Sequence, residues 1–307
     1  MKFKKIFVFY ILFFFFCRPE KNLSFKIFFI DVGHGDAILI KIPTNVRYLN
    51  ILIDGGEEKY SDDILIPFLK KQRIDTFHYL FVTHNHSDHL GGVLKVLDNF
   101  YVKNIITCQK KDSDKLYLRF LEKLNHLQLT PLKIKIGDSF LLGEKAKIKI
   151  LNCYKKGDDE NNSSLVLKLI YDTFNFLFTG DIEGKKRSES SSVCRYAEKF
   201  LVERFLKELK AKVLKVPHHG SETSLTDTFL KLVSPEIAII TAGRKRFGEV
   251  ILPDTTVILR LLRKNIKIFR TDNGDHNPQE APGDDHILIE IKNNNFVCRY
   301  YSPYLIF

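Results

Sequence analysis

The chain alternates short apolar runs with polar or glycine-containing breaks. Runs of this length, bounded in this way, are typical of buried or half-buried strands. The segments predicted as strands are 24–30, 37–42, 49–53, 79–82, 104–108, 132–136, 139–142, 145–152, 174–178, 213–216, 237–241, 266–269, 287–291 and 295–301. Helices are predicted over 62–71, 112–127, 196–209, 225–233 and 255–263. Gly91-Gly92 is expected to open a further short helix.

The first residues follow a different pattern. Three lysines precede eleven apolar residues at 6–16, and Cys17 follows. The run is too short to span a bilayer comfortably and has the proportions of a secretory signal. A buried first strand or helix is the alternative. Cys17 resembles a bacterial lipoprotein processing site, although Phe16 stands where a small residue is expected.

We therefore divide the chain into residues 1–22, a signal peptide or membrane anchor, and one domain over 23–307. Cleavage, an uncleaved anchor and lipidation all place that domain outside the cytoplasm, secreted or membrane-attached. After residue 16 no apolar run approaches bilayer length, so the chain alone cannot form a transport channel.

Composition and charge narrow the classes of partner. The 307 residues are 44% hydrophobic and carry a net charge of +11, which suits a globular protein that attracts polyanions such as DNA or anionic lipid. The five cysteines lack CxxC spacing and predict neither a disulfide framework nor a zinc knuckle. We expect buried or incidental thiols.

The strongest chemical signal is a cluster of metal-ligand types after the apolar run 79–82. Four of them fall within six residues: His84, His86, Asp88 and His89. Imidazoles and a carboxylate suit zinc, manganese or iron, and a strand-to-helix loop can turn several side chains toward one point. Merely solvated histidines are the alternative, but an ordered cluster of this kind is uncommon.

The spacing His-x-His-x-Asp-His resembles the signature of the metallo-β-lactamase fold hydrolases. This resemblance implies an α+β fold, a four-layer αββα sandwich with metals at one edge. It implies one or two divalent ions, Zn or Mn. His84 and His86 would bind the first ion, and Asp88 and His89 the second.

Two further segments sharpen the resemblance to the ComEC-like branch, the extracytoplasmic hydrolase domain of competence proteins, in a stand-alone form. They are 31–40 and 53–56. In this reading four side chains lie beside the site, where they support the metal ligands or contact the substrate: Asp31, His34, Asp36 and Asp54. The branch has Gln where this chain has His34, and an imidazole can hydrogen-bond like Gln, ligate or shuttle protons.

The later family-like segments supply the remaining candidates. Asp181, after Gly180, would bridge the two metals. Asn161 or Asn162 stands where the superfamily has a metal-binding His, which implies a weak first site with Asn162 near the substrate. Of the pair in Pro217-His218-His219-Gly220-Ser221, His218 is favoured as the last ligand and His219 as a neighbour of the substrate. Ser221 would support the ligands or contact the substrate. The reverse order of the two histidines is the alternative. Leu252 replaces a His of the branch.

The resemblance therefore predicts a metal-dependent hydrolase, a phosphodiesterase or nuclease that cuts DNA through a metal-bound hydroxide. Asp88, Asp181 and His219 would be the catalytic side chains. One alternative keeps the fold and changes the substrate to a lactone, ester or β-lactam. Another is a catalytically impaired, membrane-tethered DNA-binding protein. No protein partner is identifiable.

Overall fold

Two seven-stranded sheets form the centre of the computed structural model, which describes residues 23–107, 114–153, 159–243, 246–272 and 282–301. The first sheet has the order β18 (Asn295–Tyr301), β17 (His286–Lys292), β1 (Phe25–Phe29), β2 (Ile38–Pro43), β3 (Tyr48–Ile53), β5 (Tyr79–Val82) and β7 (Ile105–Thr107). The second has the order β16 (Lys267–Arg270), β13 (Ile237–Ile240), β12 (Val213–Lys215), β11 (Phe174–Phe178), β10 (Val166–Tyr171), β9 (Ala146–Asn152) and β8 (Ser139–Leu142).

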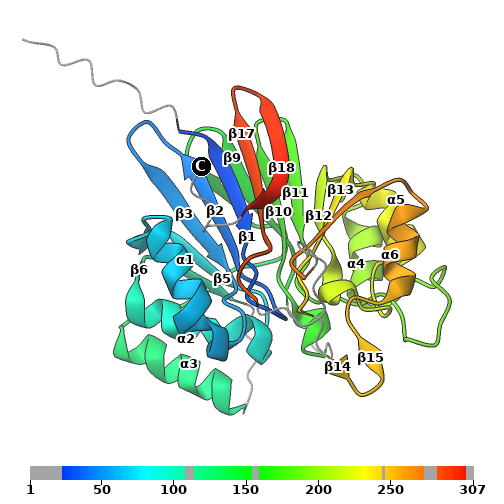
Figure 1. Ribbon diagram of the computed structural model, residues 1–307, viewed down its shortest axis with the longest axis horizontal. Helices are drawn as coiled ribbons and strands as arrows, with labels where there is room; N and C mark the ends of the chain where they lie inside the picture. Colours follow the sequence, from blue (N-terminus) through cyan, green and yellow to red (C-terminus); the bar gives the residue numbers. More distant parts are fainter. Residues whose placement is uncertain (1–22, 108–113, 154–158, 244–245, 273–281, 302–307) are drawn as a thin grey trace, which may run out of the picture.

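Helices cover the outer face of each sheet (Figure 1). On the first sheet lie α1 (Ile66–Lys71), α2 (Ser87–Asn99) and α3 (Lys115–His126), with the short turns η1 (Glu58–Tyr60) and η2 (Ser61–Leu65). On the second lie α4 (Tyr196–Arg204), α5 (Asp227–Val233) and α6 (Thr255–Leu262). Two small ribbons and two further turns complete the chain: β4 (Thr76–Phe77) with β6 (Tyr101–Val102), β14 (Arg246–Phe247) with β15 (Val250–Ile251), η3 (Asn161–Ser163) and η4 (Pro217–Gly220). The predicted αββα sandwich is confirmed.

The alternation of side chains along each strand explains why the sheets are packed both against each other and against the helices. In β1, Ile27 and Phe29 join the core between the two sheets, whereas Phe28 joins the core beneath the helices of the first sheet. In β10, Leu169 faces the other sheet and Val166 faces the second set of helices. Successive side chains of a strand point to opposite faces of its sheet, and in each sheet both faces are buried.

Three predicted elements differ from the structure. Residues 132–136 form no strand, because Leu132 and Ile134 pack against the core without a ladder. The helix predicted over 196–209 ends at Arg204. Gly91 and Gly92 lie inside α2, which begins at Ser87. A Cβ on Gly92 would lie 2.0 Å from the carbonyl oxygen of Gly55, so glycine is needed for the helix to approach that turn.

The cysteine prediction is wrong in one position. Cys153 is disulfide-bonded, whereas Cys194 and Cys298 are free thiols. Cys17 and Cys108 lie outside the described residues, as does the segment 1–22 predicted as a signal or anchor. Within the described part of the chain, no helix is long and apolar enough to cross a membrane.

A buried carboxyl group ties two helices of the second half together. Glu198 of α4 accepts hydrogen bonds from the backbone N–H groups of Leu225 and Thr226 and from the Thr226 hydroxyl, the last at 2.6 Å. Burial raises the pKa of Glu198 to about 7, although the bonds from Thr226 and Leu225 act in the opposite direction. The folded state therefore binds this proton more tightly than the unfolded state does.

The free energy of unfolding is therefore expected to depend on pH through Glu198. The contribution linked to Glu198 is full below about pH 4.5 and is lost as the pH rises through about 7. Between pH 4.5 and 7.5, the stability of the wild type relative to Glu198→Gln should fall by on the order of 3 kcal/mol. Urea unfolding at both pH values measures this difference in stability. Glu203→Gln, an exposed position on the same helix, is the control. A pH-independent difference would contradict the assignment.

Candidate metal centre

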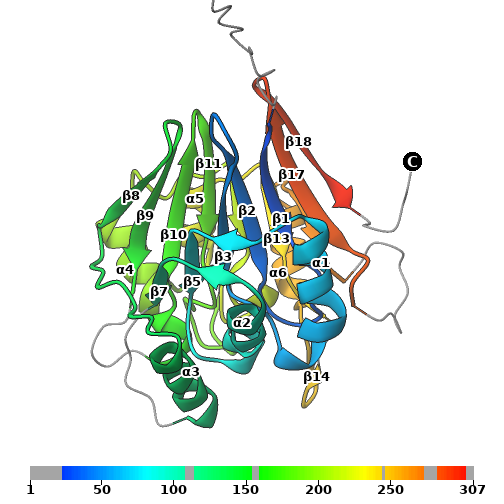
Figure 2. The same ribbon diagram turned by 90° about the vertical axis from the view of Figure 1, so that its left-hand side faces the viewer.

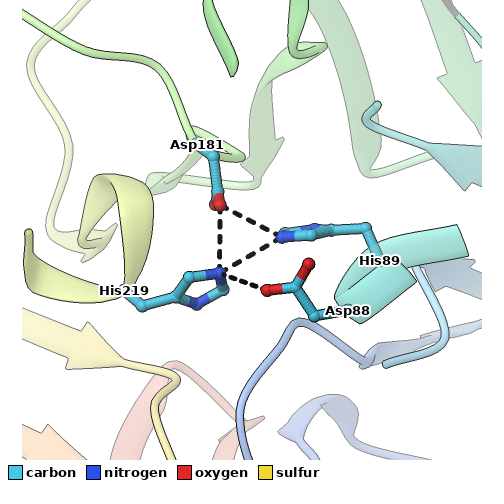
Figure 3. A group of neighbouring side chains, drawn as sticks. All are labelled: Asp88, His89, Asp181 and His219. Carbon is cyan, nitrogen blue, oxygen red and sulfur yellow. Dashed lines mark hydrogen bonds and ion pairs between the residues drawn. The ribbon is translucent and has the colours of Figure 1, made fainter. Parts of the chain in front are cut away.

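Four side chains from three segments of the chain meet at one end of the sandwich (Figure 3). Asp88 and His89 belong to the first turn of α2, Asp181 follows β11, and His219 lies in η4 after β12. Their ligand atoms all lie within 4.8 Å of one another. His219 Nε2 is 3.0 Å from Asp181 Oδ2, 3.2 Å from His89 Nε2 and 3.4 Å from Asp88 Oδ2. A tetrahedral ion with bonds of about 2.1 Å would separate its ligands by about 3.4 Å, so this donor set fits one divalent metal.

Hydrogen bonds behind the two imidazoles fix which nitrogen faces the cluster. His89 Nδ1 lies 2.8 Å from Asp54 Oδ2, and Thr83 holds the Asp54 carboxylate through its N–H at 2.7 Å and its hydroxyl at 2.6 Å. His219 Nδ1 donates to the carbonyl oxygen of Thr241 at 2.6 Å. Both rings therefore turn Nε2 toward the cluster, the arrangement that metal-binding histidines use.

A buried lysine joins the carboxylates of the site. Lys215 Nζ lies 2.6 Å from Asp36 Oδ2 and 3.4 Å from Asp181 Oδ1, and it donates to the Gly180 carbonyl at 3.0 Å. The Thr241 hydroxyl donates to Asp36. Sequence reasoning missed Lys215, Thr83 and Thr241. The available signal for Lys215 was a cation inside the apolar run Val213–Val216.

The electrostatics of the cluster follow from these contacts. Burial acts to lower the pKa of His219, but the Asp181 and Asp88 carboxylates outweigh it and raise that pKa to about 9. His89 is raised well above its usual pKa in the same way, by Asp181 and Asp54 against burial. Burial would raise the pKa of Asp181, yet His219, His89 and Lys215 hold it well below its usual range. A metal would displace protons held between these groups, so binding is expected to weaken at low pH.

His84 and His86 form a second, looser group beside the first. His84 Nε2 lies 3.1 Å from His86 Nδ1 and 4.0 Å from Asp181 Oδ2. Burial and the neighbouring His89 lower the pKa of His84 well below its usual value. Asp181 thus stands between the tight cluster and this pair.

The favoured assignment within the pair His218-His219 is reversed by the structure. His218 Nδ1 lies 3.1 Å from Glu183 Oε1 and 3.2 Å from the Thr223 hydroxyl, away from the cluster that His219 joins. Both residues adopt left-handed backbone angles, with φ of 49° and 51°. Two consecutive residues of this kind turn the chain sharply after β12, so the second histidine, not the first, faces Asp181.

The remaining predicted residues fall into two groups. His34 and Asp36 lie at the cluster: His34 Nε2 is 3.4 Å from Asp88 Oδ2, and its ring centroid is 4.3 Å from that of His219. Their loop approaches α2 closely, since a Cβ on Gly35 would lie 2.2 Å from the Asp88 carbonyl oxygen.

Three other predicted residues hold the surrounding backbone. Asp31 accepts from the N–H groups of Gly33 and Gly283, and burial raises its pKa to about 7. Asn162 Oδ1 accepts from the N–H groups of Glu183 and Ala197. The Ser221 hydroxyl bonds to Arg187 and Thr223. These contacts hold the backbone around the site, which is one of the two roles expected from the sequence, and contact with a substrate stays a prediction.

Comparisons with known proteins point to one superfamily. The model of the metallo-β-lactamase superfamily matches residues 31–244. ComE operon protein 3 of Bacillus subtilis is 27% identical over 278 residues, which cover 85% of this chain and 34% of that protein. Competence protein ComA of Neisseria gonorrhoeae is 25% identical over 254 residues, 83% of this chain and 32% of that protein. This chain spans about a third of the length of these relatives.

A solved structure supports the fold. The metallo-β-lactamase fold protein YhfI of Bacillus subtilis aligns with a TM-score of 0.50 at 12% identity, over 82% of this chain and 98% of that one. The competence-protein relatives confirm the resemblance to the ComEC-like branch.

Replacing either histidine of the pair separates the two assignments. His219→Ala is expected to weaken Zn²⁺ binding by more than about 100-fold, beyond the loss caused by an outer contact. His218→Ala, the matched control, should bind nearly as well as the wild type. Competition with a chromophoric chelator measures both affinities. Equal losses, or a larger loss in His218→Ala, would restore the original assignment.

Asp54→Ala is expected to weaken Zn²⁺ binding by about 10- to 100-fold, because His89 loses the partner that orients its ring. Asp62→Ala removes an exposed carboxylate at no cost to affinity and serves as the control. Circular dichroism establishes that both variants are folded. Unchanged affinity in Asp54→Ala would show that His89 is held without it.

Proposed function

The chain belongs to the metallo-β-lactamase superfamily, and we propose that it is a metal-dependent phosphodiesterase that cuts DNA outside the cytoplasm. The observation that carries the proposal is the convergence of Asp88, His89, Asp181 and His219 on one point, each imidazole turned by a partner behind it. The competence-protein relatives support nucleic acid as the substrate class.

In this proposal the tight cluster holds one divalent metal, Zn or Mn, and Asp181 with His84 and His86 holds a second, weaker one. A metal in the cluster would supply Lewis acidity to a phosphoryl oxygen and acidify a water. Asp88 is proposed as the proton acceptor because of its place in the cluster. Burial acts to raise the pKa of Asp88, but His219 and His89 hold it below its usual range, so the carboxylate is ionised. His34, 3.4 Å from Asp88, can take the proton onward.

A pocket of about 780 Å³ adjoins the exposed side of the pair His84–His86 and supports access by a large substrate. It lies between the start of α2 and α3, and its lining is polar: Asn85, His86, Ser87, Asp114, Lys115, Leu116, Arg119 and Glu160. Lys115 offers a cation to a phosphate backbone, whereas Arg119 is already paired with Glu58 at 2.9 and 3.0 Å. Asp114 and Glu160 add negative charge to the same pocket. Affinity for DNA would therefore depend on the metals as much as on the pocket.

An extracytoplasmic location is part of the proposal. Cys153 is disulfide-bonded, and disulfides persist in oxidising compartments. The charged and apolar start of the sequence independently favours secretion or membrane attachment.

Cleavage of labelled single- and double-stranded DNA tests the activity. The full chain is stripped of metal and then given Mn²⁺ or Zn²⁺. Metal-dependent cutting is expected, with a loss of about 100- to 10,000-fold in Asp88→Ala and no loss in Asp98→Ala on the exposed side of α2.

If the metal binds and no DNA is cut while lactones or small esters are hydrolysed, the substrate class proposed here is wrong. If neither is hydrolysed by the metal-loaded protein, the chain is a binding protein instead.

A further inference from the structure

A second charged pocket, of about 660 Å³, lies on the outer face of the second sheet beside β9, β10 and the start of β11. Six lysines line it: Lys147, Lys149, Lys168, Lys207, Lys210 and Lys212. Its two acidic residues are already paired, Glu208 with Lys149 at 2.6 Å and Glu236 with Lys212. The pocket therefore contains four more lysines than acidic residues.

Lys168 shows that the pocket is more than an exposed charged surface. It is 4% exposed in the middle of β10, and its ammonium group donates to the Lys210 carbonyl. Burial lowers its pKa to about 8, and Glu208 offsets only part of this. A buried cation held by a carbonyl is stabilised by an anion that enters the pocket.

The pocket lies at the end of the sandwich where the described chain begins. Phe25, the first residue of β1, stacks on Tyr171 at the end of β10 with ring centroids 4.2 Å apart. Thr173, in the turn that follows, lines the pocket. Figures 1 and 2 show the start of β1 and the β8–β9 and β10–β11 turns at one end, and α2 toward the other. The candidate metal centre and the lysine pocket thus lie toward opposite ends of the sandwich.

Exposed apolar residues accompany the lysines at this end. Leu141 is 79% exposed and is the cross-strand partner of Lys147. Val46, in the turn between β2 and β3, is 74% exposed. The two turns adjoin, since a Cβ on Gly143 would lie 4.0 Å from Thr44 Cγ2. Exposed apolar side chains next to a basic pocket are the chemistry of a surface that meets anionic lipid.

We propose that this end of the sandwich docks on an anionic membrane surface. The lysine pocket takes the phosphate of a lipid headgroup, and Leu141 and Val46 enter the interface. The predicted anchor or lipidation site precedes β1 and favours the same end. Single-stranded nucleic acid is less suited to the pocket, because its one aromatic lining residue, Phe174, is stacked on Phe296 and offers no free platform for bases. The proposal does not rest on the proposed hydrolysis.

Hydrogen–deuterium exchange of the full chain tests it, on vesicles of phosphatidylcholine with and without 30% phosphatidylglycerol. Exchange over 139–149 and 206–212 is expected to slow on the anionic vesicles. Lys147→Gln/Lys207→Gln should lose most of that slowing, since each lysine near a charged surface contributes about fivefold in affinity. Lys199→Gln/Lys231→Gln, an equal change of charge on α4 and α5, should retain it.

Equal exchange on both kinds of vesicle, or equal slowing in both variants, would overturn the proposal. Two further arms identify another occupant. Slowing of the same segments by 10 mM inorganic phosphate, with no response to vesicles, would assign the pocket to free phosphate. Slowing by a single-stranded oligonucleotide, with no response to lipid, would assign it to nucleic acid. Either result would overturn membrane docking.

Discussion

The salt bridge of Lys215 joins the two halves of the sandwich at the end where the candidate ligands lie. Its ammonium group is buried between Asp36, which precedes β2 of the first sheet, and Asp181, which follows β11 of the second. A buried carboxylate without a partner is costly, and here one cation serves two of them. Because Asp88 and His89 come from the first half and Asp181 and His219 from the second, this salt bridge stabilises the junction at which the cluster forms.

The same constraint explains why the site is so heavily hydrogen-bonded. Asp54 and Thr83 fix His89, and the Thr241 carbonyl fixes His219. These partners orient each ring toward the cluster, which lowers the cost of assembling it around an ion. The opposite end of the sandwich has no such network among its described residues; it presents lysines and exposed apolar side chains. The fold thus places the candidate metal centre and the proposed docking surface at opposite ends of the sandwich.

Much of this could be read from the sequence. The His-x-His-x-Asp-His cluster, Asp181 and the alternating strands depend on local order, which a sequence displays directly. The choice between His218 and His219 could not be read, because it depends on two left-handed residues after β12. The roles of Lys215, Thr83 and Thr241 depend on contacts between distant segments. The segment of Leu132 and Ile134 has the alternating apolar pattern of a strand although it forms none. Its apolar side chains pack against the core, and such packing produces the same alternation as pairing in a sheet does.

Anomalous diffraction from crystals soaked in Mn²⁺ tests the central claim most directly, because it locates the ion without reference to activity. The account predicts a peak about 2.0–2.3 Å from Asp88, His89, Asp181 and His219. A weaker second peak is expected at His84 and His86, on the other side of Asp181. A strong peak at His218 and Glu183 with none at His219, or no peak at the cluster at saturating Mn²⁺, would contradict it.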